Sequence, residues 1–134
     1  MRILAVAATI MLATAPSFAT PPKAAGWSGT WRNATNSVHI KTAPCGRGMC
    51  GTVIWANEKA KADVAANGGT LIGSQLFKDF TLGDDGLWHG QVYVPDIGQS
   101  FTGTITLNDA NTLTGTGCLF RGLACKTQVW KRVR

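Results

Sequence analysis

Short runs in which apolar and polar residues alternate, each ending at turn-forming residues, constrain this chain more than any other feature. The alternation recurs from residue 28 to residue 133, and its breaks are rich in Gly, Asp, Asn and Pro, as at residues 83–86, 95–98 and 108–111. A period of two is typical of half-buried β-strands, and these turn residues tolerate positive φ or bond their own backbone. The sequence therefore predicts an all-β fold.

The alternating runs predict eight strands. They cover residues 28–34, 37–42, 51–56, 75–82, 87–94, 100–107, 112–120 and 126–133. Tight turns join neighbouring strands antiparallel, and a sheet of eight strands removes its two unpaired edges by closing. We therefore expect one antiparallel eight-stranded β-barrel. Residues 57–69 break the pattern because they are rich in Ala and Lys, and we expect a long, mobile connection there with one or two helical turns.

The N-terminal segment has the pattern of a secretory signal peptide. An uncharged apolar run extends from Ile3 to Ala15, and Ser17 and Ala19 place small residues where a signal peptidase cleaves. An uncleaved membrane anchor is the alternative, but the run is shorter than the roughly 18 to 20 residues that cross a bilayer. We expect a periplasmic or secreted bacterial protein without a membrane span. Its predicted parts are a signal peptide at residues 1–19, a short lead at residues 20–27 and a barrel domain at residues 28–134.

Four cysteines form two local pairs, Cys45 with Cys50 and Cys118 with Cys125. An even number of cysteines in an exported chain indicates disulfides. Three connectivities are open to four cysteines, and we favour the two local pairs because glycines between their members let the backbone turn back sharply. A structural zinc site is the alternative, although both spacings are wider than the usual zinc knuckle.

The charge of the chain bears on its partners. There are 13 basic and 7 acidic residues, a net charge of +6. Outside the cytoplasm the abundant anions are lipid head groups and cell-wall polymers, so this charge is compatible with contact to the cell envelope and gives little support to nucleic-acid binding. A solvated basic surface that serves solubility explains the same charge.

The sequence lacks the usual catalytic patterns. His39 and His89 are its two histidines, and each falls in a predicted strand. It contains no glycosidase-like carboxylate pair, nucleophile elbow, phosphate loop or His-Glu-x-x-His helix. We expect no enzyme activity, no cofactor and no metal site.

An ordered series of short motifs runs through the chain after the predicted signal peptide. It consists of Gly29-Thr-Trp31, Cys50-Gly-Thr-Val-Ile-Trp55, Leu71-Ile-Gly73, Trp88-His-Gly90, Tyr93-Val-Pro-Asp-Ile-Gly98, Phe101-Thr-Gly103, Leu113, Gly117-Cys118 and Gln128-Val-Trp130-Lys-Arg132. In this series the chain resembles a bacterial family of small exported proteins, the domain of unknown function 2147, whose members are lipocalin-like barrels. The resemblance implies a lipocalin-like barrel and an exported location, and it implies no chemistry.

Trp31 and Arg132 resemble the closure device of lipocalin-type barrels. In that arrangement an early tryptophan closes one end of the barrel and an arginine from the last strand lies over its ring. A guanidinium over an indole contributes roughly 0.5 to 2 kcal/mol, depending on how far it is removed from water. We expect a structural role for this pair.

The remaining aromatic residues either fill the core or line a cavity. Our first hypothesis is that a small apolar or amphipathic molecule binds inside the barrel between Trp55, Trp88, Tyr93 and Phe101. Alternation along the strands places Val53 and Trp55 on one face, and inward glycines at Gly90 and Gly103 would open room for a ligand. A packed core is the alternative.

The second hypothesis is a filled barrel that works through its surface. Such a barrel would bind an envelope protein, as an inhibitor of an envelope enzyme, or contact an anionic envelope polymer, with peripheral membrane contact. The connection at residues 57–69 and the basic side chains of Lys126, Lys131 and Arg134 would carry the contact.

Overall fold

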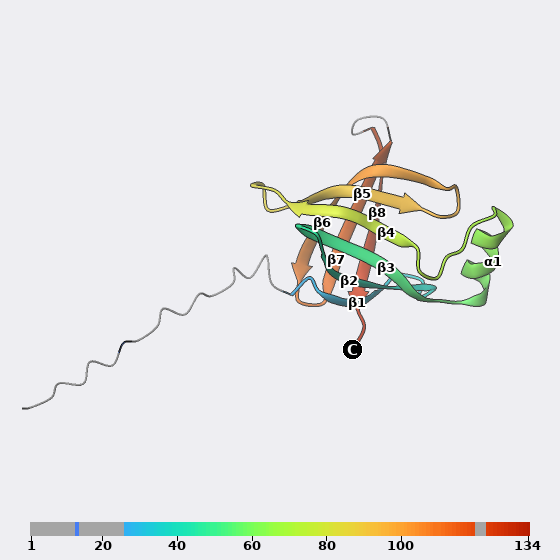
Figure 1. Ribbon diagram of the computed structural model, residues 1–134, viewed down its shortest axis with the longest axis horizontal. Coiled ribbons are helices and arrows are strands. Elements are labelled where there is room, and N and C mark those ends of the chain that lie inside the picture. Colours follow the sequence, from blue (N-terminus) through green and yellow to red (C-terminus); the bar gives the residue numbers. More distant parts are fainter. Residues whose placement is uncertain (1–12, 14–25, 120–122) are drawn as a thin grey trace, which may run out of the picture.

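A computed structural model describes residue 13, residues 26–119 and residues 123–134 (Figure 1). The predicted signal peptide is therefore almost wholly outside the described residues. Most of the predicted lead, and Phe120 at the end of the seventh predicted strand, also lie outside them.

The described chain forms a closed antiparallel barrel in which each strand pairs with its neighbours in sequence, and the last strand pairs with the first. The prediction of a single eight-stranded barrel is confirmed. The strands are β1 (Gly29–Arg32), β2 (Val38–Cys45), β3 (Gly48–Ala56), β4 (Gln75–Leu82), β5 (Trp88–Val94), β6 (Gln99–Asp109), β7 (Thr112–Leu119) and β8 (Leu123–Arg132). The hairpin between β2 and β3 is longer than predicted, because its ladder continues to Cys45 opposite Gly48.

The connection between β3 and β4 contains helix α1 (Glu58–Ala66), which Figure 1 shows beside the ends of these two strands. Its nine residues are slightly more than the one or two turns predicted. The Asn57 side chain caps the helix by accepting a hydrogen bond from the Ala60 amide at 2.8 Å. Val64 is its fully buried side chain, with 1% of its surface exposed. The helix thus covers one end of the barrel with little apolar contact.

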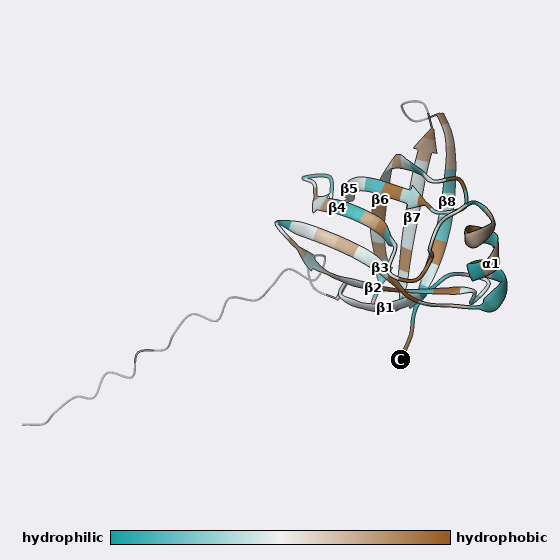
Figure 2. Ribbon diagram, turned by 45° about the vertical axis from the view of Figure 1, so that its right-hand side comes forward, coloured by the Kyte–Doolittle hydropathy of each residue, from teal (hydrophilic) through white to brown (hydrophobic). Residues whose placement is uncertain are grey.

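Alternate turns lie at opposite ends of the barrel, and the two ends differ. The closed end has the β2–β3, β4–β5 and β6–β7 turns, and the mouth end has the β1–β2 and β5–β6 turns together with α1. Apolar side chains fill the interior, and brown and pale positions alternate along the strands in Figure 2. The largest fully buried ones are Trp31, Phe80, Ile40, Met49, Ile105 and Leu113.

One buried polar group is found among the described residues, the hydroxyl of Thr42 in β2. It accepts a hydrogen bond from the Trp31 indole nitrogen at 3.0 Å and donates to the Trp27 carbonyl at 2.5 Å. A buried hydroxyl without such bonds would cost stability, so this contact fixes the first tryptophans against β2.

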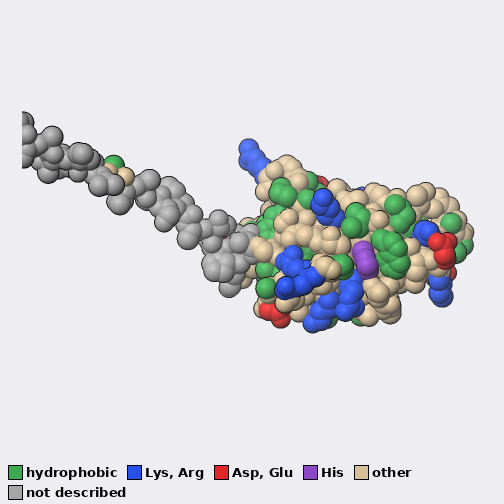
Figure 3. Space-filling model, turned by 90° about the horizontal axis from the view of Figure 1, so that it is seen from below, with side chains coloured by type: hydrophobic (Ala, Val, Ile, Leu, Met, Phe, Trp, Pro, Cys, Tyr) green, Lys and Arg blue, Asp and Glu red, His purple; other side chains and the backbone are tan. Residues whose placement is uncertain are grey.

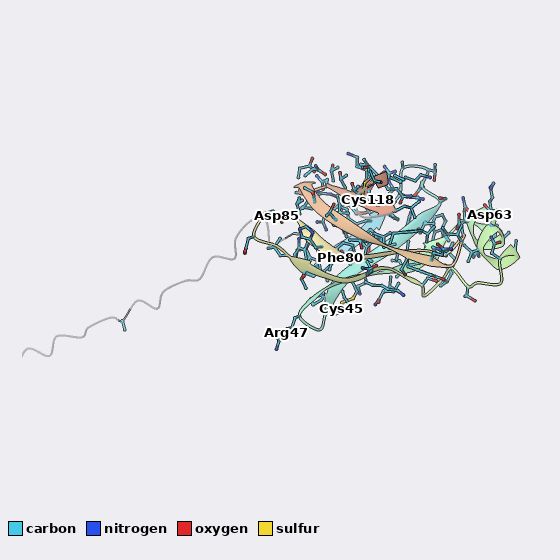
Figure 4. All side chains as sticks on the ribbon, turned by 90° about the horizontal axis from the view of Figure 1, so that it is seen from above. Cys45, Arg47, Asp63, Phe80, Asp85 and Cys118 are labelled. Carbon is cyan, nitrogen blue, oxygen red and sulfur yellow. A yellow bond between two sulfur atoms is a disulfide. The ribbon has the colours of Figure 1, made fainter. Side chains whose placement is uncertain are left out.

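Two disulfides join the predicted pairs, Cys45 with Cys50 and Cys118 with Cys125 (Figure 4). The first closes the β2–β3 hairpin at the closed end. The second links directly opposite residues of β7 and β8 at the mouth end. No free cysteine remains in the described part of the chain, so the zinc alternative is wrong.

The seam between β1 and β8 has the fewest paired residues of the eight ladders. Within the described ranges, Trp31 pairs with Arg132 and Arg32 pairs with Lys131. β1 has four residues and β8 has ten, so most of β8 extends beyond β1. Residues 123–129 of β8 are all exposed.

Helices that could cross a membrane are not found among the described residues, since none is both long and apolar enough.

Candidate functional site

A cavity of about 590 Å³ opens at the mouth end of the barrel. This volume falls within the roughly 300 to 1,000 Å³ that is usual for small-molecule sites. Side chains and backbone from the β1–β2 turn, α1, the β5–β6 turn and the inner faces of β4 to β8 surround it. The residues used below are Leu71, Leu76, Phe77, Val92, Tyr93, Phe101, Gly115, Gly117, Lys126, Gln128 and Trp130, with Asp63 and Asp96 also in the lining.

The cavity exists because β7 presents glycines to the interior. A Cβ atom on Gly115 would lie 3.9 Å from the Phe77 ring, and one on Gly117 would lie 3.8 Å from Val92. These are ordinary contact distances, so each position has room for a side chain that the sequence does not supply. The missing side-chain volume of β7 is therefore part of the cavity.

The deep wall of the cavity is apolar and aromatic. Phe77 from β4 and Trp130 from β8 meet edge to face, with ring centres 5.8 Å apart, and each has 3% of its surface exposed. Leu71 and Leu76 add buried aliphatic surface. Rigid apolar walls of this kind bind the hydrocarbon part of a ligand.

A second, polar part of the lining also belongs to β8. Lys126 and Gln128 share an inward face of the strand with Trp130, and both are exposed through the opening. The Lys126 ammonium makes no hydrogen bond or ion pair with any described residue. Of the two lining carboxylates, Asp63 forms an ion pair with Lys59 at 2.8 Å, and Asp96 interacts with the charge of the same lysine. The cavity thus combines an apolar floor with a cation that has no ionic partner in the described part of the chain.

The family model described as "Uncharacterized protein conserved in bacteria (DUF2147)" matches residues 29–132, which is nearly the whole described barrel. The chain belongs to this bacterial family. Its two disulfides and its bacterial family are consistent with an extracytoplasmic location. A search of curated proteins finds no match.

Among solved structures, the DUF2147 barrel is similar to a Helicobacter pylori protein described as "Protein HP1028 from the human pathogen Helicobacter pylori belongs to the lipocalin family". The TM-score is 0.56 at 15% sequence identity, and the match covers 80% of this chain and 82% of the other. Identity at this level supports the fold alone. The predicted lipocalin-like barrel is confirmed.

The four aromatic residues expected to share a ligand site in this DUF2147 chain do not lie together. Tyr93 and Phe101 line the cavity, as expected. Trp88 is buried against Trp27, with ring centres 5.4 Å apart, and does not line the cavity. Trp55 is 43% exposed and packs outside the barrel. The cavity therefore includes two of the four predicted residues and excludes Trp55 and Trp88.

A β-bulge explains the position of Trp55. His39 of β2 is opposite Trp55, whereas its neighbour Ile40 is opposite Val53, so Ile54 is an extra residue in β3. An inserted residue reverses the inward and outward alternation beyond it. Val53 is buried and Trp55 points outward, and the expectation that these two share a face is wrong.

The inward glycines named from the sequence also differ from those that open the cavity. A Cβ on Gly90 would lie 2.8 Å from the Phe80 ring, and one on Gly103 would lie 2.6 Å from Val92. Neighbouring side chains occupy both positions, so neither glycine opens room. Phe77, Trp130 and Lys126 were not assigned to the site, although period-two alternation in β8 places Lys126, Gln128 and Trp130 on one face.

Neither histidine lines the cavity. His89 contacts Asp85 of the exposed β4–β5 turn at 2.8 Å. A hydrogen bond from the Leu87 amide, and then the one from His89, hold the pKa of Asp85 below its usual value. His39 lies on the outer face, its ring centre 4.5 Å from that of Trp55.

Proposed function

We propose that this protein binds one small amphipathic molecule in the cavity at the mouth end. The apolar part of the ligand would lie between Phe77, Val92 and Phe101, and its polar end would meet Lys126 and Gln128. The observation that carries the proposal is a cavity of about 590 Å³ with an aromatic floor and a cation at its side.

The chemistry of the two walls argues for an amphipathic ligand rather than a purely apolar one. Each methylene moved from water into the apolar part contributes about 0.8 kcal/mol. A wholly apolar ligand would make no bond with the Lys126 ammonium, which is exposed to water through the opening. A ligand with an acceptor or a negative charge at one end would instead form a charge-assisted bond there.

Gly117→Val is the sharpest test, because the new methyl groups would enter the cavity from a position that has room for a Cβ. The probe is 1-anilinonaphthalene-8-sulfonate, an amphipathic anion whose fluorescence rises in apolar sites, and Trp130 supplies energy transfer to it. Thr116→Val is the matched control. It places valine one residue away on the outer face, where Thr116 contacts the Thr127 hydroxyl at 3.0 Å.

We expect one probe to bind per chain and Gly117→Val to weaken binding at least tenfold, with an unchanged or higher melting temperature. Thr116→Val should bind as the unaltered protein does. Native mass spectrometry of the oxidised protein from its own host would identify a natural ligand as an adduct lost on denaturation. Equal affinity in Gly117→Val and Thr116→Val would show that the probe binds outside the cavity and would contradict the proposal.

A further inference from the structure

Charge is divided unevenly along the chain. All seven acidic residues lie between Glu58 and Asp109, whereas residues 1–57 and 110–134 contain none. Strands β1, β2 and β8 therefore carry only cationic charge, and β3 between β2 and β4 carries none. The part of the barrel wall that these strands form contains no carboxylate that could neutralise its positive charge.

The register of the barrel places part of this charge in one row across four strands. Lys131 of β8 is opposite Arg32 of β1, Arg32 is opposite His39 of β2, and His39 is opposite Trp55 of β3. All four point outward, because each has a buried chain neighbour: these neighbours are Trp31, Ile40, Trp130 and Ala56. Adjacent strands lie about 4.8 Å apart, so the row is about 15 Å long. We call it, together with Lys41 and Arg134, the basic face.

The cations of the basic face form no ion pair with any described residue, although Lys131 lies close enough to the Asp109 carboxylate to interact with its charge. Lys131 donates to the Thr112 hydroxyl at 2.9 Å, and Arg134 donates to the Asn111 side-chain oxygen at 2.7 Å. Every ion pair in the described ranges lies between residues 58 and 89. Like charges directly opposite each other destabilise a sheet, so this row is unfavourable unless an anion covers it. Figure 3, which views this side of the barrel, shows Lys and Arg side chains across the middle and acidic ones towards the ends.

The row ends in exposed apolar groups. The bulge leaves Ile54 47% exposed and Trp55 43% exposed, and Ile72 is 44% exposed. The segment of Ile72 lies beside β3, because the Gly73 amide donates to the Val53 carbonyl at 2.9 Å. An indole and two aliphatic side chains thus adjoin a row of cations.

We propose that the basic face docks on an anionic phospholipid surface. Lys131, Arg32 and Lys41 would contact lipid phosphates, and Trp55 would lie at the level of the head groups. A cationic surface is attracted to anionic lipids, and tryptophan is favoured where one side of the ring is apolar and the other is wet. A purely charged polymer would satisfy the cations and leave the exposed isoleucines in water, so the lipid surface fits both parts of the face.

Docking would also bring the rim of the mouth beside Trp55 close to the membrane. Trp55 is followed by the start of α1, and Ser37 and Val38, which precede His39, line the cavity. A molecule leaving or entering the cavity would then pass close to the lipid. The docking itself does not depend on the cavity being occupied.

The test compares flotation of the oxidised protein with vesicles of phosphatidylcholine alone and with vesicles containing 30% phosphatidylglycerol. The variant is the double substitution Arg32→Gln and Lys131→Gln. The matched control is Lys59→Gln and Lys61→Gln, which removes the same charge from α1, where these lysines pair with Asp63 and Glu58. All chains carry the same N-terminal segment, so any contribution of that segment cancels.

We expect binding that needs phosphatidylglycerol, weakens as salt is raised and falls about fivefold for each cation removed from the basic face, about 25-fold in all. The α1 control should lose far less.

Brominated phosphatidylglycerol should quench the fluorescence of the unaltered protein more than that of Trp55→Phe. Equal binding to both vesicle types, an equal loss in the α1 control, or quenching that persists in Trp55→Phe would overturn the proposal. Circular dichroism and melting temperature establish that each variant is folded.

Discussion

The guanidinium carbon of Arg132 lies 4.3 Å from the centre of the Trp31 ring. The same guanidinium donates hydrogen bonds to the carbonyl oxygens of Ser28 at 3.0 Å and Ala110 at 2.7 Å, and a third to Gly26. One side chain of the last strand therefore joins the N-terminal segment, the first strand and the β6–β7 turn. Gly29 leaves the space for it, since a Cβ there would lie 2.5 Å from the Arg132 Nη1 atom.

Arg132→Met should lower the free energy of unfolding by about 2 kcal/mol, because it removes the cation over Trp31 and the charged hydrogen bonds while keeping an apolar side chain. Urea denaturation measures the change. Arg134→Met is the control. Its one side-chain bond within the described residues goes to exposed Asn111, so a change below about 0.5 kcal/mol is expected. Equal effects of the two substitutions would contradict a closure role for Arg132.

Alanine substitutions of two inward glycines should have opposite effects on the free energy of unfolding. Gly90→Ala would place its Cβ 2.7 Å from the Lys78 carbonyl oxygen and should cost about 1 to 3 kcal/mol. Gly115→Ala meets nothing closer than 3.9 Å and should stabilise by up to about 1 kcal/mol, since alanine restricts the unfolded chain more than glycine does. Thermal denaturation distinguishes them, and destabilisation by both would mean that the cavity at Gly115 is already filled.

The two disulfides should differ in their effect on ligand binding. Each closes a short loop, and the loss of either should cost about 2 to 3 kcal/mol of stability by the chain-entropy estimate. Replacing Cys118 and Cys125 with serine should also weaken binding of the anilinonaphthalene probe, because Leu119 and Ala124 beside this disulfide line the cavity. Replacing Cys45 and Cys50, at the closed end, should leave the probe affinity unchanged.

His39 should titrate below its usual pKa of 6.5, because partial burial, and then the charge of Arg32, disfavour its protonated form. The folded state thus binds this proton less tightly than the unfolded chain does. The neutral His39 side chain therefore contributes to the stability of the folded state. This contribution is fully present above pH 6.5 and is lost as the pH falls through the lower pKa of the folded state. NMR titration of the imidazole should find that Arg32→Gln raises the pKa without fully restoring it. An unchanged pKa in this variant would mean that burial alone lowers the pKa of His39.

Much of the fold could be predicted because its signals are local. Alternation and turn residues identify the strands, and glycines between nearby cysteines indicate the disulfides. Ile54 is an ordinary strand residue, however, and nothing in the sequence marks it as the extra one in a bulge. The face of Trp55 therefore could not be predicted from alternation.

The site was less predictable for a similar reason. Whether an inward glycine opens a cavity depends on which neighbour fills its space. The Phe80 ring occupies the space at Gly90, and Val92 occupies that at Gly103, whereas nothing occupies the space at Gly115. Such occupancy depends on side-chain conformations across several strands, which one sequence does not reveal.

The short seam between β1 and β8 bears on the order in which the barrel comes apart. Seven of the eight ladders join strands that follow each other in sequence, so they form from contacts between nearby residues. The last ladder joins the two ends of the chain through two residue pairs in the described ranges. Separating it breaks the fewest bonds and gains the most chain entropy. Amide hydrogens of β8 should therefore exchange with solvent before those of β6, and unfolding should start at this seam.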